Sequence, residues 1–317
     1  MKNSIISVFD TSIAAYNIGN QIIMDAVKTE LMELFPDSFL LSLPVEDIKT
    51  NARRYNAKSD ITFVGGTNIL NGDIRRYRQW DLSLHNIVML SNVVLMGCGW
   101  FQYENSPITR YTKWAFHRIL SKDYIHSVRD EYTRSKLSSI GINSINTGCP
   151  TLWRITDEVV EKIPTSKKKE VVITLTDYNR NKSRDINLLE TCLRNYDVVY
   201  FFPQGTGDIP YITELGYLNK LHFISPQIYS YNSILESGKV DYIGTRLHAG
   251  IRALQKSVRS FIIGIDNRAK EMSRDFGLPV LDESRIEELE SWINAPYKIN
   301  LNIPFERIES WKQQFLK

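Results

Sequence analysis

A strand, a turn and a helix follow one another in Val240-Asp-Tyr-Ile-Gly-Thr-Arg-Leu-His-Ala-Gly-Ile-Arg-Ala-Leu254. The apolar run Val240–Ile243 predicts a short strand that ends at Gly244, and a helix should open with Arg246 and His248 in its first turn. A helix start carries free backbone N–H groups and partial positive charge, so it favours anions. A guanidinium and an imidazole placed there could turn an anion site into a reaction site. The alternative is that Arg246 pairs with a surface carboxylate and His248 is a packed helix residue.

Strands and helices alternate on both sides of this stretch. Apolar periodicity predicts further strands at Ile5–Phe9, Ile61–Val64, Val93–Met96, Tyr124–Val128, Val171–Leu175, Val198–Phe202, His222–Ile224 and Ser260–Ile265. Helices are predicted at Ile18–Phe35, Asp185–Leu193, Ile209–Gly216, Ser230–Glu236, from near Arg268, at Glu283–Asn294 and at Phe305–Phe315. Strands separated by helices favour parallel sheets built from right-handed crossovers. The predicted fold class is α/β, with two Rossmann-like doubly wound domains facing a cleft.

The length of 317 residues suits two domains of about 150 residues each. The alternation weakens at the polar connector Lys162-Ile-Pro-Thr-Ser-Lys-Lys-Lys169, where we place the boundary. The predicted domains therefore cover residues 1–160 and 170–300. The helix within residues 301–317 could pack back on the first domain.

Composition limits the classes of partner. The chain is 43% hydrophobic and 24% charged, and its net charge of +3 is too small to suggest a nucleic-acid partner. Cations alternate with aromatic residues in Arg75-Arg-Tyr-Arg78 and in Arg110-Tyr-Thr-Lys-Trp-Ala-Phe-His-Arg118. Each cluster is either a solvated helix face or a patch that touches an anionic membrane or a lipid diphosphate.

Other classes of site and compartment are disfavoured by missing patterns. No apolar run reaches the ~18 residues that cross a bilayer, and residues 4–9 are too short for a signal sequence. Three widely spaced cysteines, Cys98, Cys149 and Cys192, fit neither a disulfide framework nor a metal site. A cytoplasmic location is therefore expected, with a possible peripheral place at the inner membrane. No motif for a tightly held metal, NAD or ATP is found in the sequence.

Two glycine-containing segments follow predicted strands, where ligands of open parallel sheets bind. They are Asn17-Ile-Gly-Asn20 and Gly65-Gly-Thr-Asn68. Glycine lets the backbone approach a ligand and offer N–H groups to its oxygens. The alternative is that both segments are only tight strand-to-helix turns.

The segments Gly244–Leu254 and Phe261-Ile-Ile-Gly-Ile-Asp-Asn-Arg-Ala-Lys-Glu271 resemble the C-terminal signature of the polysaccharide pyruvyltransferase family. The resemblance extends to Tyr16-Asn-Ile-Gly-Asn20, Val64-Gly-Gly-Thr67, Ser127-Val-Arg-Asp-Glu-Tyr-Thr133 and Thr147-Gly-Cys-Pro-Thr151. It implies an architecture like that of glycosyltransferase B enzymes. It also implies transfer of a carboxyethylidene (pyruvate ketal) group from phosphoenolpyruvate to a sugar.

The resemblance assigns the donor site to the second domain. Phosphoenolpyruvate carries a phosphate and a carboxylate, so its site needs several cations. Arg246, Arg268 and Arg129 could supply them, and Lys270 could replace Arg268, which stands where the family often has a lysine. His248 is the predicted proton donor, so Arg246 and His248 form the catalytic pair. The alternative for Arg129 is a salt bridge to one of the two acidic residues that follow it.

The acceptor is assigned to the first domain. Its predicted cradle consists of Asn17, Gly19, Asn20, Gly65, Gly66 and Thr67. Asn20 stands where the family commonly has aspartate and Thr67 where a third glycine is common. Asp208 could act as a base in the cleft, although a helix N-cap is the favoured interpretation. Trp100, Phe101 and Tyr103 could stack on a sugar or pack against their own domain.

The predicted function is transfer of a pyruvyl group to the hydroxyl pair of a sugar in a surface-polysaccharide precursor. The expected partner is a lipid-linked saccharide, and no tightly bound cofactor or metal is expected. One alternative is a nucleotide-sugar-dependent glycosyltransferase of the same architecture. Another is a non-catalytic member that binds glycan or organises an assembly complex.

Overall fold

The computed structural model describes residues 4–316. Its contacts divide the chain into two compact units. Unit 1 comprises Met1–Ala15, Ile23–Trp153 and Ile303–Lys317, and unit 2 comprises Tyr16–Ile22 and Arg154–Asn302. The division after Trp153 precedes the polar connector because the Trp153 indole donates to the carbonyl of Thr147 at 3.0 Å and packs against Trp311 within unit 1.

Unit 1 is built on a parallel sheet. Its strands are β1 (Ile5–Asp10), β2 (Phe39–Pro44), β3 (Ile61–Gly65), β4 (Val93–Met96), β5 (His126–Val128) and β6 (Ser144–Asn146). Its helices are α1 (Ile18–Leu34, with its first turn in unit 2), α2 (Thr50–Lys58), α3 (Leu84–Met89), α4 (Arg110–Ile119), α5 (Glu131–Ser138), η1 (Pro150–Leu152) and α13 (Phe305–Gln313).

The strand order of unit 1 is that of a doubly wound fold. The main sheet has the order β2-β1-β3-β4, and β5 pairs with β6. β5 continues the main sheet beside β4, where the N–H of Gly97 donates to the carbonyl of Ser127 at 3.0 Å. The resulting order, 2-1-3-4-5-6, matches the flavodoxin-like arrangement.

The last helix contributes to the core of unit 1. Trp311 and Phe315 lie against the Phe63 ring of β3, at centroid distances of 6.2 and 5.3 Å. The Trp311 indole N–H donates to the carbonyl of Ile125 at 2.8 Å. Residues 303–316 therefore complete a hydrophobic face that the N-terminal part of the chain leaves open.

Close packing against α1 explains the glycine pair after β3. A Cβ on Gly65 would lie 2.5 Å from the Val27 side chain, and one on Gly66 would lie 2.3 Å from Ile23. Gly66 also has φ +62, which favours glycine. The pair therefore allows α1 to approach the sheet.

Gly66→Ala is expected to lower the free energy of unfolding by roughly 2–4 kcal/mol, because left-handed strain and overpacking add. Gly141 provides the matched control, since it has φ +80 but no atom within 4 Å of an added Cβ. Gly141→Ala should cost only about 1 kcal/mol. Urea denaturation of both variants measures the difference, and equal losses would contradict the packing argument.

Unit 2 contains a second parallel sheet. Its strands are β7 (Glu170–Thr174), β8 (Val198–Phe201), β9 (His222–Phe223), β10 (Val240–Gly244), β11 (Ser260–Gly264) and β12 (Val280–Asp282). Its helices are α6 (Asp157–Glu161), α7 (Lys182–Asn195), α8 (Asp208–Leu215), η2 (Leu218–Lys220), α9 (Ile228–Glu236), α10 (Leu247–Gln255), α11 (Asn267–Phe276), η3 (Glu283–Glu288) and α12 (Leu289–Asn294).

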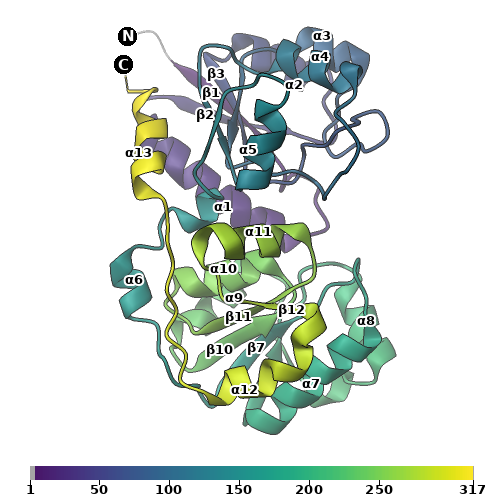
Figure 1. Ribbon diagram of the computed structural model, residues 1–317, viewed down its shortest axis with the longest axis vertical. Coiled ribbons are helices and arrows are strands. Elements are labelled where there is room, and N and C mark those ends of the chain that lie inside the picture. The colour runs from purple at the N-terminus through teal and green to yellow at the C-terminus, as the bar shows by residue number, and fades with distance from the viewer. Residues whose placement is uncertain (1–3, 317) are drawn as a thin grey trace. The chain divides into compact units, whose positions relative to one another are not determined.

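The order β12-β11-β10-β7-β8-β9 gives unit 2 the Rossmann topology. Counted from its own first strand, this is the order 3-2-1-4-5-6 read from the opposite edge. Figure 1 shows α9, α10 and α11 on one face of the sheet and α7 and α12 on the other. The predicted α/β class with two Rossmann-like domains is confirmed.

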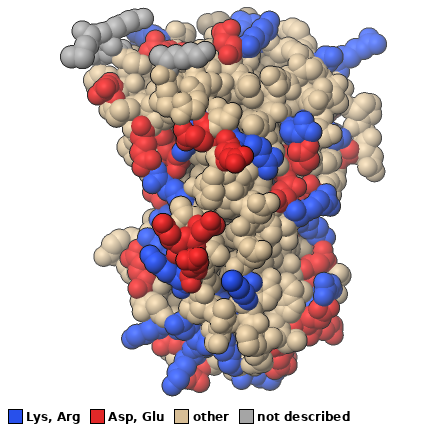
Figure 2. Space-filling view, turned by 60° about the vertical axis from the view of Figure 1, so that its left-hand side comes forward, with Lys and Arg blue, Asp and Glu red and all other residues tan. Residues whose placement is uncertain are grey.

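Charged residues of both signs are interspersed on one face of the molecule (Figure 2), in agreement with the small net charge. Lysine and arginine side chains alternate with aspartate and glutamate on the face shown in Figure 2, so no field of one sign covers that face. Within residues 4–316, every helix is too short or too polar to span a bilayer.

Candidate functional site

The connections of unit 2 reverse direction between β7 and β10. From β7 the chain moves outward to β8 and β9, and it then returns to β10 on the other side of β7. In open α/β sheets, ligands bind outside the carboxyl ends of the strands at such a point. Four loops gather there, after β7, β8, β10 and β11, and they hold a cluster of arginine and aspartate side chains.

Arg246 lies at the centre of this edge. It is the N-cap residue of α10 and is buried. Its Nε donates to the carbonyl of Leu175 at 3.0 Å, and its Nη2 donates to carboxylates of Asp177 at 2.9 Å and Asp208 at 2.5 Å. Its Nη1 makes no hydrogen bond with residues 4–316. The arginine is thus fixed on one side while one nitrogen keeps its donors for another group.

Asp208 is the most buried acid of the cluster. Its carboxylate accepts hydrogen bonds from the backbone N–H groups of Gln204 and Gly205, both at 2.8 Å. Burial raises the pKa of Asp208, and the Arg246 guanidinium opposes that rise. The N-cap interpretation is wrong by one residue, because Asp208 is the first residue of α8 and Gly207 is its N-cap. The Asp208 carboxylate bonds to the preceding loop.

Tyr178 joins Arg246 to Arg268. The Arg246 guanidinium lies over the Tyr178 ring, 5.2 Å from its centroid, and the Arg268 Nη2 donates to the Tyr178 hydroxyl at 2.6 Å. Arg268 also pairs with Asp266, the N-cap of α11. Two predicted donor-binding arginines are therefore neighbours at the end of the sheet.

His248 is held in the first turn of α10. It is buried, with 6% of its surface exposed. A Cβ on Gly250 would lie 2.4 Å from Ile262, so glycine at this position brings α10 close to the sheet. The Tyr231 hydroxyl donates to the carbonyl of Ala249 at 2.8 Å and fixes the same turn. The histidine thus occupies a rigid position two residues after Arg246.

The segment that contains Asn17 and Gly19 lies in unit 2. Asn17 pairs with Gly205 in an antiparallel bridge, and the N–H of Ile18 donates to the carbonyl of Gln204 at 2.9 Å. The Asn17 side chain accepts from the N–H of Gly19 at 2.8 Å. These residues, with Asn20, belong to the unit of Arg246, whereas the sequence placed them in the first domain.

The other half of the predicted cradle, Gly65, Gly66 and Thr67, stays in unit 1. The N–H of Gly66 donates to the carbonyl of Met96 at 2.8 Å, and the carbonyl of Thr67 accepts from Gly99 at 2.8 Å. Together with the packing against α1, these bonds favour the tight-turn interpretation of the glycine pair.

Arg129 and Lys270 both have carboxylate partners. Arg129 is fully buried, its Nε and Nη2 bond to Asp130, and its Nη1 bonds to Asn68. This is the salt-bridge alternative for Arg129. Lys270 pairs with Asp282 at the end of β12, at 2.9 Å. That pair holds the pKa of Asp282 at about 2, because the Lys270 hydrogen bond stabilises the carboxylate.

Two aromatic candidates, Trp100 and Tyr103, contact other residues of unit 1. Trp100 is fully buried, and its indole N–H donates to Glu104 at 2.8 Å. Tyr103 is half exposed and lies edge-to-face on Tyr132 at 5.1 Å. For Trp100 the packing interpretation holds.

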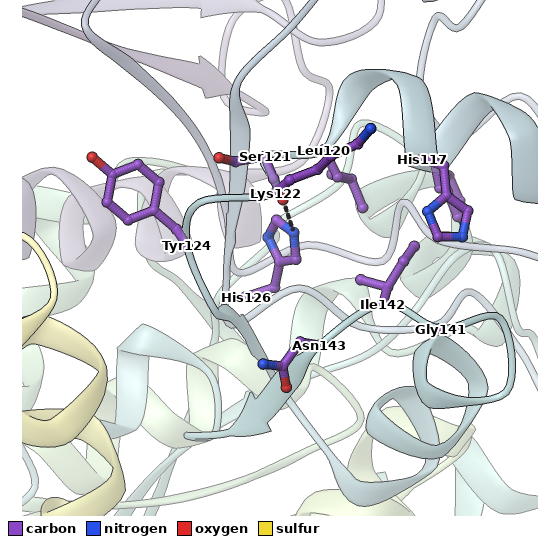
Figure 3. A pocket seen from close by; sticks show the side chains of 10 residues that line it. His117, Leu120, Ser121, Lys122, Tyr124, His126, Gly141, Ile142 and Asn143 are labelled. Atoms are coloured by element: carbon purple, nitrogen blue, oxygen red, sulfur yellow. Dashed lines mark hydrogen bonds between the residues drawn. The ribbon is translucent and has the colours of Figure 1, made fainter.

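A cavity of about 260 Å³ in unit 1 contains two histidines, and we assign it no site. Figure 3 shows His126 bonded to the carbonyl of Ser121 and His117 on the opposite side. His126 Nδ1 accepts from the N–H of Leu95 at 3.2 Å, so its Nε2 carries the proton. Both nitrogens therefore serve the fold: Nδ1 links β5 to β4, and Nε2 links β5 to the segment that follows α4.

Burial lowers the pKa of His126 to about 4 from its ordinary value of 6.5. Between pH 6.5 and 4 the unfolded chain binds a proton at His126 that the folded state does not bind. The stability that His126 contributes is therefore fully present above pH 6.5 and is lost as the pH falls towards 4. The free energy of unfolding should therefore decrease by about 3 kcal/mol over that interval. Urea titrations at several pH values measure it. His126→Gln should flatten the slope while His117→Gln preserves it, and an unchanged slope in His126→Gln would contradict the assignment.

No group of three or more His, Cys, Asp or Glu side chains suited to a metal ion is found in the described part of the chain, residues 4–316. The residues that sequence reasoning missed are Asp177 and Tyr178. Both lie in the loop that follows β7, so their position shortly after a predicted strand was the available signal.

Comparison with known proteins gives a family and a fold. The model of the family "Polysaccharide pyruvyl transferase" matches residues 17–267. No curated protein matches the chain in sequence.

Among solved structures, the chain is similar to the UDP-GlcNAc 2-epimerase of Methanocaldococcus jannaschii, with a TM-score of 0.54, 14% identity and coverage of 99% of this chain and 98% of the other. The same enzyme in complex with UDP-GlcNAc and UDP gives a TM-score of 0.51 at 15% identity, with the same coverage. The MnaA–UDP structure from S. aureus gives 0.51 at 11% identity, covering 99% and 97%. At these identities the likeness shows the glycosyltransferase B-like fold alone.

Proposed function

Because the chain belongs to the polysaccharide pyruvyl transferase family, we propose that it transfers the pyruvyl group of phosphoenolpyruvate to two hydroxyl groups of one sugar. The product would be a carboxyethylidene ketal on a surface-polysaccharide precursor, and inorganic phosphate would be released. We propose a lipid-linked saccharide as the acceptor.

One observation carries the donor assignment: Arg246 and Arg268 share Tyr178 at the point where the connections of the unit 2 sheet reverse. The Nη1 donors of Arg246 make no bond with residues 4–316, so they suit an oxygen of phosphate or carboxylate. Asp177 and Asp208 hold the guanidinium in place but offset its charge. Arg268, itself held by Asp266, would be the second cation for a donor with two acidic groups.

The proposed reaction delivers one proton to carbon and takes two from the sugar hydroxyls. One of these two restores the proton donor, and the other leaves with the phosphate. Protonation of the methylene carbon of phosphoenolpyruvate makes it a methyl group and leaves C2 electrophilic. The first sugar hydroxyl adds to C2 and loses its proton, and the C2–O bond to phosphate then breaks. The second hydroxyl attacks C2, loses its proton and closes the ketal. We assign delivery of the first proton to His248, which lies two residues after the Arg246 cap, in the first turn of α10.

Incubation of the protein with phosphoenolpyruvate and lipid-linked glycans tests the proposal. We expect phosphate release that depends on the glycan, and mass spectrometry should show a glycan carrying one added carboxyethylidene group. Phosphate release without the added mass would indicate hydrolysis, and failure to consume phosphoenolpyruvate with any acceptor would reject the proposal.

The competing function is sugar transfer from a nucleotide-activated donor. Two of the similar structures, one of the Methanocaldococcus jannaschii epimerase and that of S. aureus MnaA, are described with UDP bound, which is the observation that favours this alternative. It predicts release of a nucleoside diphosphate rather than phosphate. The same incubation with UDP-sugars as donors separates the two functions.

A further inference from the structure

Helices α3 and α4 of unit 1 form a surface that the donor site does not use. α3 packs against α4, and the two helices lie side by side in Figure 1. Arg118 of α4 donates to the carbonyls of Val88 and Leu90 at the end of α3, at 2.6 and 3.2 Å. We call the exposed side of these helices, with the preceding segment Arg75–Arg78, the α3–α4 surface.

Large apolar side chains are concentrated on the α3–α4 surface. Four apolar side chains of α3 and α4 are exposed. The exposed fractions are 61% for Leu84, 49% for Val88, 48% for Met89 and 43% for Trp114. The Trp114 ring lies against Tyr111 at 5.5 Å, so these two rings of α4 form one aromatic pair. Apolar groups gathered in this way mark an interaction surface more often than scattered ones do.

Cations surround the apolar groups with almost no acid to balance them. Residues 75–89 and 110–118 contain six cations, Arg75, Arg76, Arg78, Arg110, Lys113 and Arg118, and one acid, Asp81, which gives a net charge of +5 (6 − 1). The Asp81 carboxylate is already bound to the N–H of Ile48 and to the Asn86 side chain. The chain as a whole carries only +3, so this surface is locally enriched in positive charge.

Most of these cations keep their donors for an external partner. The side chains of Arg78, Arg110 and Lys113 form no hydrogen bond or ion pair with residues 4–316. Arg75 lies over the Tyr111 ring at 5.0 Å, and its nearest carboxylate, that of Asp73, is 3.9 Å away. Such pairs at an exposed surface contribute little to stability, so the cations are not explained by the fold.

The α3–α4 surface also contains a hollow. A cavity of about 340 Å³ is lined by Arg75, Arg78, Leu84 and Tyr111, among others. Its lining combines two guanidinium groups with apolar and aromatic side chains, and its one acid, Asp81, is bound to Ile48 and Asn86. This combination suits a group that is anionic at one end and apolar at the other, as a phospholipid headgroup region is.

The start of α4 favours anions as well. Arg110 and Lys113 occupy its first turn, and that turn contains no acidic residue. A helix start is the positive end of the helix dipole, so cations there are unfavourable until an anion approaches. The side chain of Thr109 caps the helix and leaves the two cations directed to the exposed side.

We propose that the α3–α4 surface docks on a membrane containing anionic phospholipids, with the cations at the headgroups and Leu84, Val88, Met89 and Trp114 at the apolar boundary. This inference does not depend on the proposed pyruvyl transfer, because its residues lie outside the donor site. A membrane partner explains why exposed apolar residues and cations occur together on this surface. A second copy of the chain would bring the same positive charge against itself.

Sedimentation with lipid vesicles tests the proposal. The protein should sediment with vesicles of phosphatidylcholine mixed with phosphatidylglycerol, and it should remain in the supernatant with phosphatidylcholine alone. Arg110→Glu/Lys113→Glu should weaken the partition by at least about tenfold, because each cation near an anionic surface contributes about fivefold. The double variant should fold, since acidic residues are favourable in the first turn of a helix.

Two further variants keep the test decisive. Lys49→Glu/Arg54→Glu reverses the same number of exposed charges elsewhere in unit 1, and it should leave the partition within about twofold. Arg78→Glu, a single change at an unpaired side chain, should weaken it by about fivefold or more. Absence of binding to the anionic vesicles, or equal losses in the two double variants, would overturn the proposal.

Discussion

His248→Asn is expected to lower kcat for phosphate release from phosphoenolpyruvate by about 100- to 10,000-fold, the range for loss of a general acid. Asparagine has a similar shape and can still donate a hydrogen bond, but it cannot deliver a proton. Because His248 is assigned to protonation rather than to binding, the KM for phosphoenolpyruvate should change little. Steady-state measurement of phosphate release gives both constants.

His126→Asn is the control for this result. His126 is also buried, but it lies in unit 1 and its two nitrogens bond to the backbone. Its replacement should lower stability at neutral pH and leave kcat within about threefold. If His248→Asn retained half or more of the wild-type kcat, His248 would not be the proton donor.

Arg246→Lys is expected to raise the KM for phosphoenolpyruvate by about 10- to 100-fold, the effect of losing one charge-assisted hydrogen bond. Lysine keeps the charge that Asp177 and Asp208 require, but its single ammonium cannot hold both carboxylates and also present the Nη1 donors. The kcat should fall much less than in His248→Asn. Phosphoenolpyruvate titrations of the two variants distinguish the roles.

Arg246→Ala should act differently, because it removes the cation that pairs with the buried Asp208 carboxylate. Leaving Asp208 uncompensated should lower the free energy of unfolding by roughly 3–5 kcal/mol. The matched control is Arg259→Lys. Arg259 is equally buried in unit 2 and paired with Asp241 at 3.1 Å, outside the site. That variant should lose stability without a change in KM, and a raised KM in it would show that KM follows stability rather than binding.

The elements of the fold were predicted well where an apolar run was buried on both faces. β4 and β10 are fully buried, and the predicted strand at Val93–Met96 agrees with β4 residue for residue. β2 was missed because it is an edge strand with mixed exposure that ends at Pro44. β12, also at an edge and only three residues long, was missed for the same reason. Edge strands bury little, so their sequences carry little of the pattern.

The candidate site was predicted only in part, because partners far apart in sequence cannot be paired without the fold. Sequence reasoning chose Arg246, Arg268 and His248 from their places after strands. It did not find that Arg246 is held by Asp177 and Asp208, 69 and 38 residues away. For Arg129 the neighbouring acid offered a simple alternative, and the structure has that salt bridge.

Each unit is built from separate segments of the chain, so the two units cannot be completed one after the other during translation. Unit 1 includes Ile303–Lys317, whose Trp311 and Phe315 cover β3, and unit 2 includes Tyr16–Ile22. On the ribosome, the aromatic face of Phe63 therefore stays uncovered while all of unit 2 is being translated. Nascent chains halted before residue 303 should bind holdase chaperones through that face, and release of the final helix should end the association.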